Sequence, residues 1–231
     1  MTDLHCHVLP FVDDGSDSVE NSILMIEDAV RQGVKNLVLT PHYRKGVFDK
    51  DDKKIIEVFE NFKKEVERRS LPVKLFLGRE ITVFSGFSKM IEDKSFLSIA
   101  GGKFVLVEFP YQKEVDIEEI CYGIKLNGFT PIVAHVERYS YFRNASDVER
   151  LRKSGVVIQV NAASVVNKSY KEENKFVKLL LKKKLVDIVA SDFHFSRVNY
   201  MGQAYKKVKS KYKEYAELIF KINPEYVISQ K

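Results

Sequence analysis

Short apolar runs alternate with longer amphipathic stretches along this chain of 231 residues, and this alternation limits the possible folds more than any other feature. The runs are almost continuously apolar and lack the alternation of a half-exposed strand, which indicates parallel strands buried on both faces. We expect strands at residues 3–4, 36–40, 73–77, 104–108, 132–134, 156–160 and 187–190. We expect helices at residues 18–32, 51–69, 86–92, 116–127, 146–153 and 172–184, and a longer one from near Tyr200.

Seven strand-then-helix units without an obvious linker predict a single domain over residues 1–231, built as one closed or nearly closed α/β barrel. An open, doubly wound sheet is the alternative. A hydrophobic content of 45% with 30% charged residues is typical of a globular chain with a substantial core. No apolar run is long enough for a membrane span, and the N-terminus lacks the regions of a signal peptide, so we expect no membrane insertion and a cytoplasmic location.

Polar side chains gather at the carboxyl ends of the expected strands. All five histidines of the chain lie at or just after such an end, together with several acids and one amide. The candidates are His5, His7, His42, His135, His194, Glu80, Glu108, Asn161 and Asp192, with Asp14 in a turn-like stretch before Gly15. Active sites of parallel α/β folds form at this edge. Glu108 ends an apolar strand, so its carboxylate would be buried and would need a cation or a hydrogen-bond partner.

Five histidines and at least four acids at one edge predict a metal centre. Nitrogen and oxygen ligands in this mixture suit zinc, manganese or iron, and the absence of thiolate ligands argues against a structural zinc site. The ligands are too many for one ion, so we expect two or three. Metals that share a bridging water generate hydroxide at neutral pH and clamp the oxygens of an in-line displacement, which favours phosphate ester hydrolysis.

Two arginines stand beside the proposed ligands in sequence. Arg44 follows His42, and Arg138 follows His135, and arginine binds phosphate as a bidentate fork. A thiol phosphatase needs an arginine six residues after its cysteine, but those positions hold Val12 and Asn127. No nucleoside triphosphate loop of the type G-x-x-x-x-G-K-[ST] is present.

The net charge of +6 has much of its lysine excess after Asn167. Two interpretations stay open for these lysines, a solvated helix face and a dedicated anion-binding patch. No second nucleic-acid-binding module is visible, so we expect no nucleic acid partner.

The motifs together resemble the PHP (polymerase and histidinol phosphatase) superfamily. Within it, the segments LHCHVLPFVDDG and AHVERY are similar to the manganese-dependent protein-tyrosine phosphatases of bacterial capsule and exopolysaccharide loci. The resemblance runs in order from residue 2 to about residue 195. Val136 stands where the family usually has proline, and Arg197 lies nearer the D-x-H pair than the second arginine of the family does.

The resemblance implies a distorted (β/α)7 TIM-like barrel with three divalent ions, Mn²⁺ foremost and Zn²⁺ or Fe²⁺ as alternatives. Its ligand sets would be His5, His7, Glu80 and Asp192 for one ion, Glu80, Glu108 and His135 for the second, and Asp14, His42 and His194 for the third. Arg138 matches a phosphate-binding arginine of the family. We expect Arg138, Arg44 and Arg197 to be catalytic, and Arg138, Arg44 and Asn161 to bind substrate. We expect no chemical role for Cys6 and a structural one for Asp13.

The implied function is hydrolysis of phosphotyrosine by a metal-bridging hydroxide, on a membrane-associated bacterial tyrosine autokinase that regulates capsule or exopolysaccharide synthesis. The alternatives are a histidinol-phosphate phosphatase or another phosphoesterase of the superfamily. A non-enzymatic, metal-binding regulator is disfavoured because no proposed ligand is missing.

Overall fold

A computed structural model describes residues 1–111 and 113–230, and all its paired strands run parallel. The strands are β1 (Thr2–Cys6), β2 (Asn36–Leu39), β3 (His42–Tyr43), β4 (Lys74–Leu77), β5 (Glu80–Thr82), β6 (Phe104–Glu108), β7 (Thr130–Val133), β8 (Val157–Asn161) and β9 (Ile188–Ala190). Residues 40–41 separate β2 from β3, and residues 78–79 separate β4 from β5. The nine strands therefore occupy seven positions, one for each expected apolar run.

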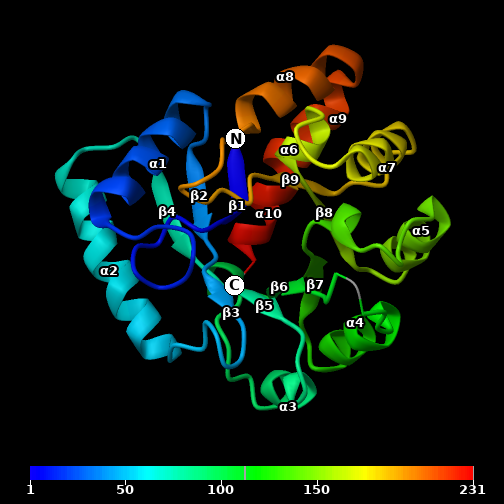
Figure 1. Cartoon of the computed structure of the whole chain (residues 1–231), viewed down its shortest axis with the longest axis horizontal. Helices are drawn as coiled ribbons and strands as arrows, with labels where there is room; N and C mark the ends of the chain where they lie inside the picture. The colour runs from blue at the N-terminus through cyan, green and yellow to red at the C-terminus, as the bar shows by residue number, and fades with distance from the viewer. Residues whose placement is uncertain (112, 231) are drawn as a thin grey trace.

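These positions follow one another in chain order around a curled sheet (Figure 1). One set of hydrogen-bonded strands has the order β1-β2-β4, and the other has the order β3-β5-β6-β7-β8-β9. Beyond β9, the backbone returns to β1, because Asp192 N–H donates to the carbonyl of His5 and His7 N–H donates to that of Phe193, each at 2.9 Å. The predicted distorted barrel is confirmed, and the open sheet is not formed.

Helices surround this sheet (Figure 1). They are α1 (Val19–Arg31), α2 (Asp52–Arg68), α3 (Phe87–Glu92), α4 (Ile117–Leu126), α5 (Ala145–Lys153), α6 (Ala162–Val165), α7 (Lys171–Lys182), α8 (Met201–Lys211), α9 (Lys213–Glu217) and α10 (Asn223–Ser229). The shorter turns are η1 (Ile99–Gly101), η2 (Val136–Arg138) and η3 (Leu218–Ile222). The single longer helix expected from Tyr200 is wrong, because the backbone of Tyr212 leaves the helical region (φ −140°, ψ 67°) and divides it.

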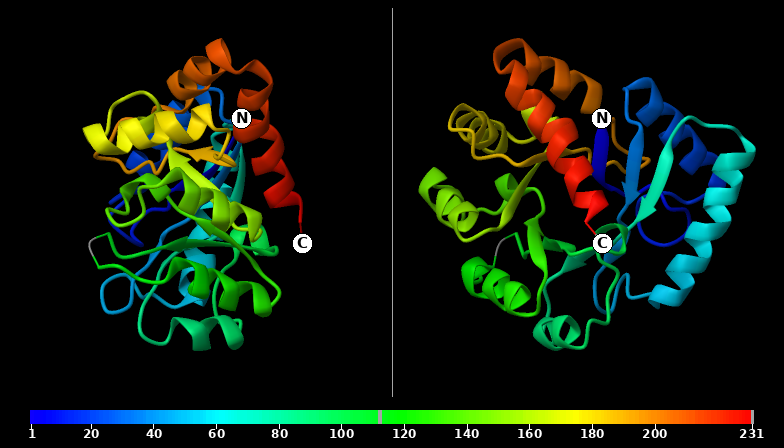
Figure 2. Two further views of the ribbon diagram at one scale, coloured as in Figure 1. Left: turned by 90° about the vertical axis from the view of Figure 1, so that its right-hand side faces the viewer. Right: turned by 180° about the vertical axis from the view of Figure 1, so that it is seen from behind.

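Helix α10 closes the amino end of the barrel. Its Val227 is buried in a cluster with inward-facing strand residues such as Leu4, Leu106 and Ile188. The carbonyl of Gln230 accepts from the N–H of Lys103, the residue before β6. Seen from behind, α10 crosses this mouth of the barrel (Figure 2). The polar side chains at the carboxyl ends of the strands lie at the other mouth.

Among the described residues, no helix combines the length and the apolar character that a membrane crossing requires.

Candidate metal centre

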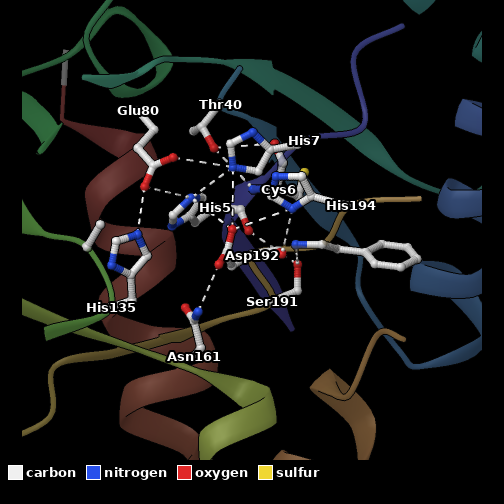
Figure 3. A network of polar contacts seen from close by, with 12 residues as sticks. His5, Cys6, His7, Thr40, Glu80, His135, Asn161, Ser191, Asp192 and His194 are labelled. Atoms are coloured by element: carbon white, nitrogen blue, oxygen red, sulfur yellow. Dashed lines mark hydrogen bonds and ion pairs between the residues drawn. The ribbon is translucent and has the colours of Figure 1, made fainter. Parts of the chain in front are cut away.

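The nine predicted ligands lie together at the carboxyl ends of the strands. Every one of them is buried except Asp14, which is exposed. They come from β1 (His5), the segment after it (His7, Asp14), the starts of β3 (His42) and β5 (Glu80), the end of β6 (Glu108), and the segments after β7 (His135) and β9 (Asp192, His194). Figure 3 shows His5, His7, Glu80 and Asp192 pointing toward one another.

His5 and His7 direct their Nε2 atoms at each other, 3.1 Å apart. Gln159 Oε1 lies 3.1 Å from His5 Nδ1 and also accepts from the N–H of His135, so the amide oxygen faces His5 and Nδ1 carries the hydrogen. His7 Nδ1 in turn donates to a carboxylate oxygen of Asp13 at 2.8 Å. In the neutral rings both Nε2 atoms therefore present lone pairs to the same point. Two lone pairs this close repel unless a cation lies between them, which is the arrangement that a metal ion resolves.

Among the described residues, three groups of side chains have ligand atoms close enough to share an ion, all within 4.8 Å of one another inside each group. They are His5, His7 and Glu80, then His42, Glu80 and Glu108, then His7, Asp14, His42 and His194. His135, which the resemblance placed with Glu80 and Glu108, has its Nε2 atom 2.8 Å from Glu80 Oε1 and 3.8 Å from Glu108 Oε1. Asp192 Oδ1 lies 3.6 Å from His5 Nε2.

Unpartnered polar atoms mark the same place. Within residues 1–111 and 113–230, His42 Nδ1, Glu80 Oε2, His135 Nδ1 and His194 Nε2 are buried without a hydrogen-bond partner. His42 Nδ1 and Glu80 Oε2 lie only 2.8 Å apart and still form no hydrogen bond. Burial of unpaired polar atoms costs about 1–3 kcal/mol each. A divalent cation would satisfy imidazole and carboxylate lone pairs together, so these residues fit the metal centre predicted from the sequence.

The charge of the site also suits cations. Burial alone would raise the pKa of Glu80, but the imidazoles of His5 and His42 reverse this and hold that pKa well below its usual range. Burial likewise lowers the pKa of His7, and the Asp13 carboxylate reverses this and raises it well above normal. The buried carboxylates thus stay ionised and draw positive charge to the imidazoles. A metal ion entering the site competes with protons for the same nitrogens.

Two of the candidate ligands adopt a strained backbone. His135 has φ 32° and Asp192 has φ 49°, in the left-handed region that non-glycine residues seldom occupy. Each residue lies two positions beyond the end of a strand, where the chain turns sharply and aims the side chain into the mouth. Such conformations cost about 1–3 kcal/mol and cluster at functional sites. The backbone at Gly15 packs directly against His7, where only glycine fits. A Cβ atom at this position would lie 2.0 Å from the carbonyl oxygen of His7.

Asp13 and Gln159 orient the ligands from outside the cluster. Besides His7, Asp13 accepts from the backbone N–H of His42 at 2.9 Å and of Gly15 at 3.0 Å, in agreement with the structural role expected for it. Gln159 was not predicted from the sequence. The available signal was a single amide inside the apolar run VVIQV, because a buried amide requires partners.

Asn161 has both polar atoms of its side chain engaged. Its Nδ2 donates to Asp192 Oδ2 at 2.9 Å, and its Oδ1 accepts from Gln159 Nε2 at 2.9 Å. Through these contacts Asn161 positions Asp192. The sequence prediction for Asn161 was substrate binding.

The three predicted arginines all reach carboxylates of the cluster. Arg138 and Arg197 each place Nη1 3.2 Å from Asp192 Oδ2, and Arg44 places Nη2 3.1 Å from Glu108 Oε2. Each arginine side chain remains partly exposed. The arginines therefore lie at the boundary between the buried ligands and solvent, where an anion entering the mouth would meet them.

Tyr111 and Thr82 are contacts of Glu108 that the sequence analysis did not identify. The hydroxyl of Tyr111 donates to Glu108 Oε1, and that of Thr82 donates to Oε2 at 2.5 Å. The ring of Tyr111 also lies under the guanidinium of Arg138, 4.8 Å from its centroid. Tyr111 follows Glu108 by three residues, in a loop where no local pattern indicates its direction.

Cys6 points away from the cluster, as expected from the alternation of side chains along β1. Its Sγ donates to the carbonyl of Val38 at 3.2 Å, and burial raises the pKa of its thiol well above normal. A buried, protonated thiol is neither a nucleophile nor a metal ligand.

Comparison with known proteins relates the whole chain to one family. The family model for capsular polysaccharide synthesis, CpsB/CapC, matches residues 1–229. The tyrosine-protein phosphatase CpsB of Streptococcus agalactiae is 32% identical over 238 aligned residues, covering 99% of this chain and 98% of that protein.

Solved structures agree with this relationship. Crystal structures of YwqE from Bacillus subtilis and CpsB from Streptococcus pneumoniae, described as unique metal-dependent tyrosine phosphatases, match with a TM-score of 0.92 and 29% identity, covering all of this chain and 96% of theirs. A phosphotriesterase homology protein from Escherichia coli matches with a TM-score of 0.61 at 10% identity, covering 97% of this chain and 96% of its own. That second likeness is one of fold alone.

Proposed function

This chain belongs to the CpsB/CapC family of capsular polysaccharide synthesis, and on that premise we propose that it is a metal-dependent protein-tyrosine phosphatase. The observation that carries the proposal is the contact of Arg138 with Asp192 at the edge of a buried cluster of converging lone pairs. Such an edge places a phosphate-binding guanidinium next to a group of candidate metal ligands. A phosphate ester is the substrate class that both would bind.

We propose that all nine candidate ligands hold divalent ions, in three sites, with Mn²⁺ as the native metal. The donor set of imidazoles and carboxylates without thiolate suits this ion. Divalent ions in such a cluster supply Lewis acidity, which lowers the pKa of water and neutralises phosphate oxygens.

The protein's own residues then bind and orient the ester. Arg138, held over the ring of Tyr111 and against Asp192, presents its remaining N–H groups to the phosphoryl oxygens. Arg197, which contacts the same Asp192 oxygen as Arg138, and Arg44, which contacts Glu108, would offer further N–H groups to the ester. The phenolate of tyrosine has a pKa of about 10, so it leaves without a strong general acid.

A protein substrate suits the surroundings of the mouth better than a small phosphomonoester. The loops that follow β1, β3 and β9 carry the exposed apolar side chains Phe11, Val47, Phe195 and Val198, between 45% and 64% exposed. Exposed apolar side chains on neighbouring loops are typical of a surface that contacts another macromolecule. A histidinol-phosphate phosphatase would instead need a pocket that encloses its small ligand. The exposed apolar side chains around the mouth therefore favour the protein substrate.

We propose further that the substrate is a phosphorylated tyrosine kinase of the bacterial membrane, met by this chain in the cytoplasm. The capsular synthesis family supports the setting. The kinase itself follows only from the resemblance of the sequence motifs.

One activity panel tests the proposal. Phosphotyrosine peptide, phosphoserine peptide and histidinol phosphate are assayed with Mn²⁺, with and without a chelator. We expect hydrolysis of the phosphotyrosine peptide foremost, and its loss on chelation. Hydrolysis of histidinol phosphate alone would overturn the tyrosine assignment, and activity that survives both chelation and His42→Ala would overturn the metal mechanism.

A further inference from the structure

A cavity of about 310 Å³ lies between helices α6, α7 and α8, and it shares no residue with the candidate metal centre. Figure 1 shows α6 with α7 and α8 on either side of it. The cavity is bordered by Lys178 and Lys182 of α7 and by Lys207 and Lys211 of α8, with Leu181 and Val208 among its apolar lining. We refer to it as the lysine cleft.

The spacing of the lysines makes two parallel rows. Lys178 and Lys182 are four residues apart on α7, and Lys207 and Lys211 are four residues apart on α8. Residues at this spacing share one face of a helix. Each helix therefore turns a pair of ammonium groups toward the same apolar cavity.

These four lysines have no acidic partner within the described chain, whereas two other lysines on the same helices do. Lys175 on α7 pairs with Glu172 at 3.3 Å, and Lys209 on α8 pairs with Glu217 at 3.3 Å. No ion pair with Lys178, Lys182, Lys207 or Lys211 forms within residues 1–111 and 113–230. Burial, together with the nearby charges of Lys211 and Lys178, lowers the pKa of Lys207, in agreement with crowding of like charges. The cleft thus concentrates positive charge that the fold does not neutralise.

We propose that the lysine cleft binds an acidic peptide segment of a partner protein, with one large apolar side chain inserted between the helices. Leu181 and Val208 are 8% and 3% exposed and provide an apolar lining for that side chain. Carboxylates on either side of the inserted residue would then pair with the two lysine rows. A concave, apolar cavity favours an inserted side chain over a flat lipid surface, which would contact protruding lysines instead. This binding is independent of the proposed phosphatase activity.

The test uses the whole protein and a fluorescein-labelled peptide, DEDLEDE, with binding measured by fluorescence anisotropy. The double variant Lys178→Gln/Lys207→Gln removes one lysine from each row, and Lys175→Gln/Lys209→Gln removes two paired lysines from the same helices. Thermal unfolding establishes that both variants fold. We expect the Kd of the peptide to rise about fivefold in the cleft variant and less than about twofold in the control variant. The peptide DEDGEDE, which lacks the apolar residue, should bind about tenfold more weakly than DEDLEDE.

Equal weakening by both variants would overturn the proposal, because it would show attraction to net charge alone. Equal affinity for the leucine and glycine peptides would also overturn it, since the cavity would then have no role. Two further probes identify other occupants. Preferential binding to phosphatidylglycerol vesicles, or displacement of the peptide by inorganic phosphate where chloride at equal ionic strength is ineffective, would replace the acidic peptide with a lipid surface or a small anion.

Discussion

Replacing Asp13 with asparagine tests whether the hydrogen bond to His7 sets the affinity for metal. The Asp13 side chain has no exposed surface, and its oxygens accept from His7 Nδ1 and from the backbone of His42 and Gly15 at 2.8–3.0 Å. The carboxylate fixes the tautomer of His7 and increases the basicity of its Nε2 atom. Asp13→Asn keeps the shape but removes the charge, and losing such a partner typically weakens metal binding about 10- to 100-fold. That range corresponds to about 1.4–2.8 kcal/mol.

The same substitution also places an amide NH₂ group where a carboxylate oxygen accepted a backbone N–H. One donor then stays unpaired, which should lower the free energy of unfolding by about 1–3 kcal/mol. Manganese titration by calorimetry gives the affinity, and activity at saturating Mn²⁺ should recover most of the wild-type rate. Asp17→Asn is the matched control, because Asp17 is exposed and, among the described residues, its side chain accepts a hydrogen bond from Asn21 alone. Unchanged manganese affinity in a folded Asp13→Asn protein would refute this reasoning.

Three further predictions concern a glycine, an arginine and the thiols. Gly15→Ala should prevent normal folding of the first loop, since its Cβ would overlap a backbone oxygen at 2.0 Å. Its melting temperature should lie well below that of Gly123→Ala, where a Cβ meets nothing within 4 Å. Similar melting temperatures for the two variants would contradict this. Arg138→Lys should lower kcat/KM for a phosphotyrosine peptide about 10- to 100-fold, because lysine cannot make bidentate contacts with phosphate. Elemental analysis should find the same amount of bound metal as in the wild type. Loss of the metal would show that the role of Arg138 is structural. Burial raises the pKa of Cys121 to about 12 and that of Cys6 well above normal, so a thiol-specific reagent at pH 8 should label neither in the native protein, and rapid labelling with loss of activity would revive a thiol mechanism.

The sequence was sufficient to predict where the candidate site lies, for a simple physical reason. In a parallel barrel, the first polar residue after each apolar run must fall at the same mouth, so Glu108 and His135 could be brought together although they belong to different strands. The apolar runs also gave all seven strand positions. Local patterns did not reveal that residues 40–41 and 78–79 divide two of them, because such breaks depend on how the sheet curls.

Contacts over long sequence distances account for what the sequence did not predict. Gln159 is separated from His5 by 154 residues, and no local pattern indicates which buried amide meets which imidazole. The closure of the amino end of the barrel by Val227 likewise depends on contacts between the two ends of the chain, such as the packing of Val227 in one cluster with Leu4. For the lysines after Asn167, the sequence left a solvated face and an anion-binding patch as alternatives. The cavity between α7 and α8 is what distinguishes the four lysines that border it.

The most direct test of the metal centre is anomalous X-ray diffraction from crystals grown with Mn²⁺. Converging lone pairs predict anomalous peaks within the cluster, the first of them between His5 Nε2 and His7 Nε2, with those two nitrogens further apart than their 3.1 Å separation here. Further peaks should lie beside Glu80 and Glu108 and beside Asp14 and His194. Absence of any peak at saturating Mn²⁺, with His5 and His7 still in direct contact, would contradict the central claim that this mouth of the barrel is a metal centre.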